Sequence, residues 1–339
     1  MKNIKAYSLG ELESEVVSLG LERYRAQQIF TWLWKRNAGD FGVMTNLAKS
    51  LRERLANDYY IGRLKVLSRT SGTDGTTKLL LGLEDSESIE AVYIPEGSRR
   101  TVCVSTQVGC PLKCVFCASG RIGFKRNLLS WEIADQVLLI KEVLGIEVSN
   151  VVFMGIGEPL LNLVEVMRAF QLLNSDHALN IGARHITVST AGIVEGIEEL
   201  ARSSWRVKLA ISLNATTDTL RDQIMPINRE YPLKRLLEAI RFYVRTREVR
   251  ATFEYILIEG VNDRTADARR LVKLLAGIPS KLNLIPLNEI PGLAYRRPTE
   301  ARVLDFYEKL KDQPIPVMLR KSKGAEIMAG CGQLKAAYG

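Results

Sequence analysis

Apolar residues in the first part of the chain recur at the spacing of amphipathic helices. Ser8 and Glu11 form a capping-box pattern that begins the first helix, and Gly20 stands where that helix would end. Two apolar stripes follow at intervals of three and four residues: Tyr24, Ile29, Phe30, Leu33 and Trp34, then Leu47, Leu51 and Leu55. The pattern predicts a small N-terminal accessory domain of three or four helices over residues 1–62.

Beyond this region the pattern changes to short extended runs. They cover residues 64–70, 77–83 and 89–94. The first two flank Thr73-Asp74-Gly75, a turn sequence that predicts a hairpin. Residues 63–100 are therefore expected to form a β extension that links the helices to the rest of the chain.

Glu90 is an acidic residue inside the third of these runs. If the strand alternates regularly, its side chain lies on the same face as Val92 and Ile94. A carboxylate among apolar neighbours could act as a general base, whereas on a solvated face it would have no chemical role.

From residue 101 onward, extended apolar runs alternate with amphipathic helical patterns. The strand candidates cover residues 101–106, 150–154, 184–189, 208–213, 252–258 and 281–286. The helical patterns lie near residues 131–144, 163–174, 194–201, 233–246, 266–275 and 299–310. Repeated strand–helix units indicate a parallel sheet covered by helices. The expected fold class is α/β, with a partial (β/α)6 barrel over residues 101–339 and reacting groups on the loops that follow its strands.

Composition narrows the class of protein. The chain has 339 residues, 46% hydrophobic and 25% charged, which is an ordinary globular balance. The first residues lack the apolar core of a secretion signal, and no apolar run is long enough to span a membrane. Five cysteines, an odd number with three of them close together, do not suit a disulfide framework. We therefore expect a cytoplasmic protein.

The net charge of +9 points to a polyanionic partner, of which nucleic acid is the commonest. Several basic pairs fall near loops of the predicted barrel: Arg99-Arg100, Lys125-Arg126, Arg296-Arg297 and Arg320-Lys321. A solvated basic surface without a partner is the alternative interpretation.

Three cysteines lie close together in the loop after the first barrel strand: Cys110, Cys114 and Cys117. Thiolates are soft ligands that select iron–sulfur clusters, zinc or Cu(I). Three thiolates hold a 4Fe–4S cluster with one iron open to a small molecule. The spacing resembles that of the radical S-adenosylmethionine (SAM) enzymes, in which the open iron binds SAM and the reduced cluster cleaves it to a 5′-deoxyadenosyl radical. A zinc site completed by Cys103, or plain buried thiols, would be the alternatives.

Polar residues follow several of the other predicted strands. Because the carboxyl ends of parallel strands meet at one edge, these side chains are expected to converge there. The glycine- and glutamate-containing loop 154–159 resembles the SAM-binding loop of radical SAM enzymes. Taken singly, each of these positions could be a turn or a strand cap. The candidate SAM contacts are Gly157, Glu158, Ser189, Ser212, Leu213, Asn214 and Asn288.

The motifs taken together resemble one family. They comprise the cysteine loop, Met154–Pro159, Ser212-Leu213-Asn214, Met225-Pro226-Ile227-Asn228 and Gly330-Cys331-Gly332-Gln333-Leu334. This set is similar to the RlmN/Cfr group of radical SAM RNA methyltransferases, from about residue 90 to the C-terminus, with a weaker similarity in the N-terminal helices. The resemblance implies methylation of an adenine in 23S ribosomal RNA, adenosine 2503, and for the RlmN branch also of adenosine 37 in some transfer RNAs.

The resemblance also implies a mechanism that uses two SAM molecules per turnover. One methylates Cys331, and the other yields the radical that removes hydrogen from the new methyl group. The thiomethylene radical then adds to the adenine. Proton removal by Glu90 and attack by Cys103 release the methylated base and leave a Cys103–Cys331 disulfide. An electron donor such as flavodoxin or ferredoxin is implied, and nothing demands more than a monomer.

The choice between carbon 2 and carbon 8 of the adenine rests on smaller features. Pro159 after Glu158, and the segment 286–292, are typical of the RlmN branch and favour carbon 2. Ile156 replaces a common methionine and Asn214 a frequent histidine of the family. Methylation of carbon 8, as in the Cfr branch, is the nearest alternative. A zinc-containing RNA-binding protein without catalytic activity, or an electron-transfer iron–sulfur protein, would be alternatives of another class.

Overall fold

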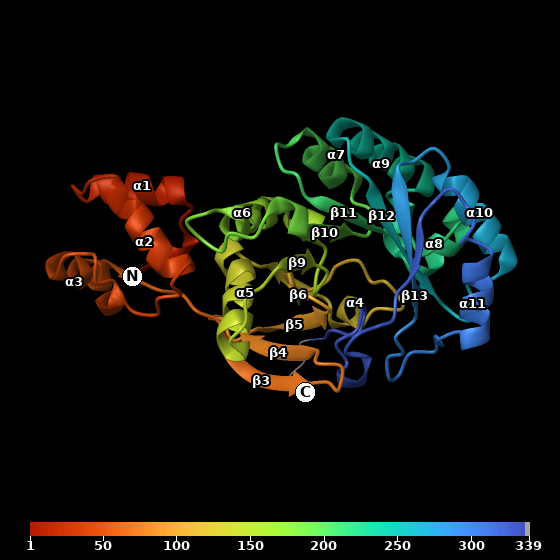
Figure 1. The fold of residues 1–339 in the computed structure, drawn as a ribbon, viewed down its shortest axis with the longest axis horizontal. Helices are drawn as coiled ribbons and strands as arrows, with labels where there is room; N and C mark the ends of the chain where they lie inside the picture. Colours follow the sequence, from red (N-terminus) through yellow and green to blue (C-terminus); the bar gives the residue numbers. More distant parts are fainter. Residues whose placement is uncertain (336–339) are drawn as a thin grey trace.

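A single mixed sheet organises the computed structural model, which describes residues 1–335. The strand order is β14-β13-β12-β11-β10-β9-β6-β5-β4-β3 (Figure 1). Strands β6 and β9 to β14 pair in parallel, whereas β3, β4 and β5 pair antiparallel at one edge. The parallel strands are β6 (Arg99–Cys103), β9 (Asn150–Phe153), β10 (Ile186–Thr190), β11 (Lys208–Ser212), β12 (Ala251–Leu257), β13 (Ser280–Pro286) and β14 (Val317–Leu319).

Helices cross between successive parallel strands and cover the sheet. They are α5 (Ser130–Leu144), α6 (Leu163–Asn174), α7 (Val194–Arg202), α8 (Asp218–Ile224), α9 (Leu233–Arg247), α10 (Thr265–Leu275) and α11 (Glu300–Glu308). Apolar residues face the sheet: in α9 they include Leu236, Ile240 and Tyr243, all fully buried. The expected α/β class with a parallel barrel sheet is confirmed.

The N-terminal segment forms three helices at one end of the molecule, beside α5 and α6 (Figure 1). They are α1 (Leu9–Ser18), α2 (Tyr24–Trp34) and α3 (Lys49–Asp58), and the short strands β1 (Lys2–Asn3) and β2 (Tyr59–Tyr60) pair beneath them. Ser8 and Glu11 form the capping box that the sequence indicates. A buried ion pair joins this segment to α5, with Lys5 Nζ 2.5 Å from Asp135 Oδ1.

The predicted β extension forms β3 (Lys65–Ser71), β4 (Thr77–Gly82) and β5 (Ser88–Glu96). These strands do not stand apart from the barrel, because β5 pairs with β6 and so continues the main sheet. The proposed division of the chain at residues 62 and 100 remains a prediction.

Several short elements were not expected from the sequence. A hairpin of β7 (Gln107–Gly109) and β8 (Phe124–Asn127) brackets the short helix α4 (Ser119–Ile122). Single turns of 3-10 helix occur at Ile4–Ala6, Phe41–Val43, Pro159–Asn162, Ala183–His185, Pro226–Arg229 and Ala325–Ile327. Over residues 1–335, none of the helices combines the length and the apolar character needed to cross a bilayer.

Candidate active site

The three-cysteine loop begins directly after β7 and lies among the C-terminal ends of the parallel strands. Cys110 N–H donates to Gly123 O at 3.2 Å, which closes the loop on itself. Val115 N–H donates to Ile224 O at 3.1 Å and so joins the loop to the end of α8. Cys110 is buried, and Cys114 and Cys117 are partly buried.

The thiols of this loop are close enough to influence one another. Burial, with a smaller contribution from the nearby Cys117, raises the pKa of Cys110 to about 12. Burial also raises the pKa of Cys114, again with contributions from the other two thiols, while Arg221 opposes the rise. Three soft donors beside a guanidinium fit an anionic iron–sulfur cluster bound through thiolates.

No three His, Cys, Asp or Glu side chains within residues 1–335 are gathered as closely as ligands of a single metal ion would be.

Cys103, at the end of β6, lies with Cys331. Burial raises the pKa of the Cys103 thiol to about 12, and Cys331 is the group whose charge adds to that rise. Cys103 packs between the sheet and the segment that carries Cys331. There it belongs to a small apolar cluster with Val92, Ile156, Ala329 and Leu334. Cys103, which would be the fourth ligand of a zinc site, therefore lies near Cys331.

Cys331 is exposed to solvent. The surrounding atoms remove water from the Cys331 thiol, and this desolvation raises its pKa. The positive charge of Arg320 opposes the rise.

The segment that carries Cys331, residues 324–335, is held by backbone contacts on both of its sides. Ala118 N–H donates to Gly332 O at 2.7 Å, directly after the last cysteine of the loop. Asn288 Nδ2 donates to Cys331 O at 3.1 Å, and Ser119 Oγ donates to Leu334 O at 2.7 Å. These bonds bring together two cysteine motifs that lie far apart in the sequence.

Glu90 lies on β5, almost fully buried, and meets the same segment. Its Oε2 accepts a hydrogen bond from Lys335 N–H at 2.8 Å, and its Oε1 lies 2.9 Å from Lys78 Nζ. A basic neighbour of Glu90 was not expected from the sequence: Lys78 reaches the carboxylate from the adjacent strand β4. The available signal was a lysine inside the apolar run 77–83.

The loop after β9 contains Gly157 and Glu158. A Cβ at Gly157, where φ is +108°, would lie 2.6 Å from Gln107 Cβ. The glycine therefore permits a close approach of the loop to Gln107, and its contact with SAM stays a prediction. Glu158 is buried, and its oxygens accept hydrogen bonds from Ala191 N–H at 2.7 Å and Leu160 N–H at 3.1 Å. Burial raises its pKa to about 7 even though these amides favour the ionised form.

The remaining candidate contacts differ in accessibility. Ser189 and Ser212 are partly exposed at the ends of β10 and β11. Leu213 and Asn214 are fully buried. The Asn214 amide has partners within the protein, since its Oδ1 accepts from Ile256 N–H at 2.9 Å and its Nδ2 contacts Met225 Sδ at 3.4 Å. These two residues form the wall of the site.

Two groups at the barrel mouth were missed by reasoning from the sequence. Arg221 of α8 is fully buried and donates to the backbone carbonyls of Ala191, Ser212 and Leu213, so it orders the strand ends. Glu254 of β12 accepts a hydrogen bond from Asn283 Nδ2 at 2.8 Å. Among the described residues, neither Glu254 Oε2 nor Asn288 Oδ1 has a hydrogen-bond partner. Glu254 interrupts the apolar run of β12, which was the available signal, whereas Arg221 lies in a mostly polar helix that gives no such signal.

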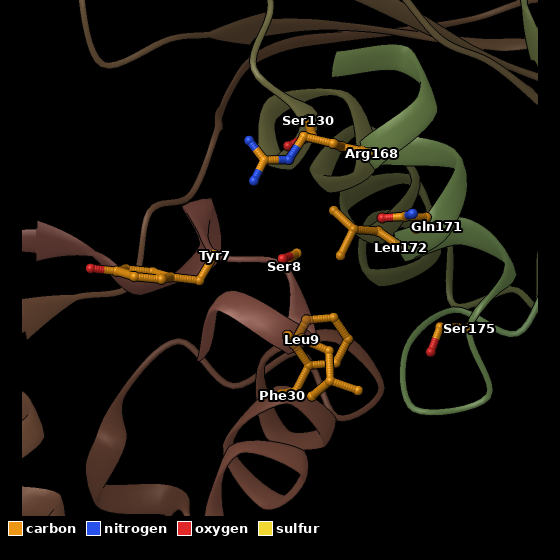
Figure 2. A pocket seen from close by; sticks show the side chains of 10 residues that line it. Tyr7, Ser8, Leu9, Phe30, Ser130, Arg168, Gln171, Leu172 and Ser175 are labelled. Carbon is orange, nitrogen blue, oxygen red and sulfur yellow. The ribbon is translucent and has the colours of Figure 1, made fainter. Parts of the chain in front are cut away.

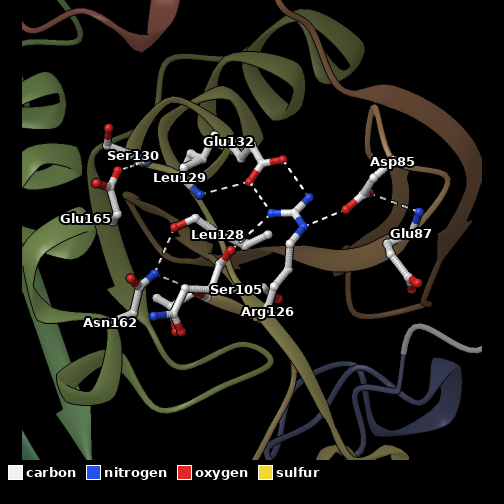
Figure 3. Close-up of polar contacts among 12 residues, drawn as sticks. Asp85, Glu87, Ser105, Arg126, Leu128, Leu129, Ser130, Glu132, Asn162 and Glu165 are labelled. Atoms are coloured by element: carbon white, nitrogen blue, oxygen red, sulfur yellow. Dashed lines mark hydrogen bonds and ion pairs between the residues drawn. The ribbon is translucent and has the colours of Figure 1, made fainter.

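One predicted basic pair is engaged within the protein. Arg126 Nη1 and Nη2 contact Glu132 at 2.8 and 2.9 Å, and Arg126 Nε contacts Asp85 at 2.6 Å (Figure 3). Lys125 Nζ lies 2.7 Å from Glu87. These contacts anchor the hairpin that brackets the cysteine loop.

Two recesses open on the surface. One, of about 370 Å³, lies between the N-terminal segment and α6, with Leu9 and Phe30 across from Leu172 (Figure 2). The second, of about 450 Å³, is lined by Glu289, Met328 and Gln333 and adjoins the Cys331 segment. The second recess is therefore the one continuous with the candidate site.

The fold and the cysteine loop define the class of protein, a radical SAM enzyme. The description "Radical SAM superfamily" matches residues 104–272. The description "Ribosomal RNA large subunit methyltransferase N-terminal domain" matches residues 2–61.

Full-length relatives identify the family. The dual-specificity RNA methyltransferase RlmN of Geobacter sulfurreducens is 49% identical, over 99% of this chain and 92% of its own length. That of Pelobacter propionicus is 44% identical over 98% and 95% of the two chains. A crystal structure of a radical SAM methyltransferase from Sphaerobacter thermophilus superposes with a TM-score of 0.95 at 42% identity, over 99% of this chain and 100% of that one. The chain belongs to the RlmN family of radical SAM RNA methyltransferases, whose cofactors are a 4Fe–4S cluster and SAM.

Proposed function

We propose that this RNA methyltransferase acts on carbon 2 of an adenine, using Cys331 as the carrier of the transferred carbon. The observation that supports this most directly is the meeting of Cys103, Cys331 and Glu90 at one end of the sheet. A shuttle through a cysteine needs a second thiol to release it and a base to take up a proton, and these two residues supply such groups.

The cofactors have a matching set of ligands. Cys110, Cys114 and Cys117 would hold the cluster. Gly157, Glu158, Ser189, Ser212 and Asn288 would contact SAM, with Leu213 and Asn214 as the wall behind it. When bound, these groups supply the transferred methyl and the radical chemistry that activates it.

Three residues of the chain would carry out the transfer of the carbon, the removal of the proton and the release of the product. Cys331 Sγ carries the one-carbon unit and forms the covalent link to the adenine. The Glu90 carboxylate accepts the proton that leaves carbon 2, as a general base does. The one electron left over from the radical addition would return to the cluster held by the cysteine loop. Cys103 Sγ, once it has lost its proton, attacks Cys331 Sγ and a disulfide forms. The bond between Cys331 Sγ and the transferred carbon breaks, and that carbon keeps the electron pair and takes up a proton to become the methyl group. The high pKa of Cys103, about 12, makes loss of its proton part of this last step.

The substrate follows from the same chemistry. Carbon 2 of an adenine is reached only when the base leaves its stack, which costs a few kcal/mol. A loop or an extruded nucleotide is therefore the target. By analogy with relatives named as dual-specificity enzymes, adenosine 2503 of 23S ribosomal RNA and adenosine 37 of some transfer RNAs are the proposed substrates. We further propose a cytoplasmic monomer reduced by flavodoxin or ferredoxin.

The test is mass spectrometry of the target adenosine after incubation with the protein, SAM and a reductant. The product expected is 2-methyladenosine; 8-methyladenosine would show a Cfr-like reaction and refute the carbon 2 assignment. Cys331→Ala should abolish methylation while retaining the iron and sulfide content of the wild type. A colourless, zinc-containing preparation without activity would instead show a non-catalytic RNA-binding protein.

A further inference from the structure

Lys78 stands between the proposed base and the segment that carries Cys331. Its Nζ lies 2.9 Å from Glu90 Oε1 and donates to Met328 O at 3.1 Å. The lysine side chain is 16% exposed and that of Glu90 is 8% exposed, so water screens this pair poorly. One ammonium group thus contacts both the carboxylate and the backbone three residues before Cys331.

The position of Lys78 in the sheet explains how it reaches Glu90. In the antiparallel pairing of β4 with β5, Lys78 is opposite Val92 and Leu80 is opposite Glu90. Lys78 and Glu90 are therefore diagonal neighbours on one face, a distance that a long side chain spans. Lys78 can therefore contact the Glu90 carboxylate while the regular pairing of β4 with β5 is kept.

The C-terminal segment does not depend on Lys78 for its attachment. Glu326 accepts hydrogen bonds from the backbone and side chain of Thr73, and Asp74 Oδ2 accepts one from Gly324 N–H at 2.9 Å. Further along, Ala118 N–H contacts Gly332 O at 2.7 Å. Since these bonds dock the segment on both sides of Met328, the contribution of Lys78 is to the placement of Glu90 relative to it.

We propose that Lys78 is a positioning residue for the methyl transfer, holding the Glu90 carboxylate beside the segment that carries Cys331. This inference rests on the proposed function. In the step concerned, the C–H bond at carbon 2 of the linked adenine breaks and the proton passes to a Glu90 oxygen. The electron pair of that bond restores the aromatic ring, and the odd electron left by the radical addition would pass to the iron–sulfur cluster held by the cysteine loop. A carboxylate fixed at its place accepts that proton far better than one free to rotate away.

Removal of the lysine charge leaves Glu90 buried without its cation. Such a carboxylate is costly, and it turns toward solvent or takes up a proton. Either response removes the proton acceptor after the adenine has become linked to Cys331. Lys78→Met keeps the length of the side chain and deletes the charge, and Lys78→Arg restores a cation with several donors.

The experiment compares K78M, K78R, K141M and C103A with the wild type. The matched control is Lys141 of α5. Its side chain is 26% exposed, and its Nζ lies 2.9 Å from a Glu147 carboxylate oxygen. The readouts are methylated RNA, 5′-deoxyadenosine formed, and the covalent protein–RNA adduct detected by gel and mass spectrometry. For K78M we expect product formation about 100-fold slower, the first equivalent of 5′-deoxyadenosine per chain formed at the wild-type rate, and adduct accumulated as in C103A. K78R should regain product and lose the adduct, and K141M should behave as wild type.

A second readout does not depend on activity. Hydrogen exchange in residues 324–335 should be faster in K78M than in K141M, because Lys335 N–H loses a fixed acceptor. Methylation by K78M within about twofold of K141M would overturn the proposal. So would a parallel loss of product and 5′-deoxyadenosine without adduct, since that pattern means that Lys78 only supports folding. Absence of adduct in C103A as well would instead refute the cysteine shuttle, and this inference with it.

Discussion

The backbone N–H of Ala118 donates a hydrogen bond to the carbonyl oxygen of Gly332 at 2.7 Å. Ala118 follows Cys117, and Gly332 follows Cys331, so one bond ties the proposed cluster loop to the proposed carbon carrier. The relationship makes the position of Cys331 depend on that of the cysteine loop, and it provides a site at which the docking can be tested.

Gly332→Ala should separate docking from folding. Gly332 has φ +83°, and a Cβ there would lie 3.2 Å from Phe116 O, so an alanine is both strained and crowded. A displacement of about 1 Å at a reacting group costs about 100-fold in rate. We expect methylation to fall by at least about tenfold, with only the small fall in the midpoint of urea unfolding that an alanine at positive φ causes.

The control for this substitution is Gly277→Ala. Gly277 has a similar φ of +72° with nothing within 4 Å of a built Cβ. Its methylation rate should match the wild type. Equal losses in the two variants would mean that backbone strain, and not contact with the cysteine loop, explains the effect at Gly332.

Cys103→Ala should trap the protein on its RNA. Without the second thiol, the link between Cys331 and the adenine has no group to break it. Denaturing electrophoresis should show a slow band that nuclease digestion collapses. The double variant Cys103→Ala, Cys331→Ala should show no such band, and a band that persists there would rule out Cys331 as the point of attachment.

Glu158 should make the stability of the cluster-free chain depend on pH. Its pKa is raised from 4.5 to about 7 by burial, so the folded state binds a proton that the unfolded state has lost. The stabilisation is therefore complete below about pH 4.5 and is lost as the pH rises through about 7. Urea unfolding of wild type and Glu158→Gln at several pH values should show their difference changing by about 3 kcal/mol in that direction. A difference independent of pH would contradict the assignment.

The buried pair of Lys5 and Asp135 should hold the N-terminal helices on the barrel. Their side chains are 0% and 1% exposed, and burial lowers the pKa of Lys5 while Asp135 opposes it. Lys5→Met leaves the carboxylate unpaired, which typically costs about 3–5 kcal/mol. Lys2→Met, which removes the exposed partner of Glu15, should leave the urea midpoint unchanged. Equal changes in the urea midpoint for the two substitutions would show that the buried pair contributes no more to stability than the exposed one.

The succession of strands and helices was predictable because it depends on local pattern. The helix expected at 163–174 is α6 (Leu163–Asn174), and the strand expected at 281–286 is β13 (Ser280–Pro286). Each has an apolar periodicity that can be seen within one window of the sequence. Hairpin β7–β8 was missed because its strands are short and mostly polar, and are paired around an inserted loop.

The pairing of the strands could not be predicted from the local sequence in the same way. Nothing local shows that β5 lies beside β6, and without that pairing the diagonal contact of Lys78 with Glu90 has no basis. The close approach of Gly157 to Gln107 was hidden for a similar reason, because the two residues lie in different parts of the chain.

The sequence by itself determined the chemical class of this protein, because the spacing of Cys110, Cys114 and Cys117 is a property of one short loop. Only the tertiary structure decided which other groups meet there. The approach of Cys331 to Cys103, and of Lys78 to Glu90, is the outcome of many weak contacts between distant segments. Such contacts exist only once the sheet has formed and the C-terminal segment has packed against it.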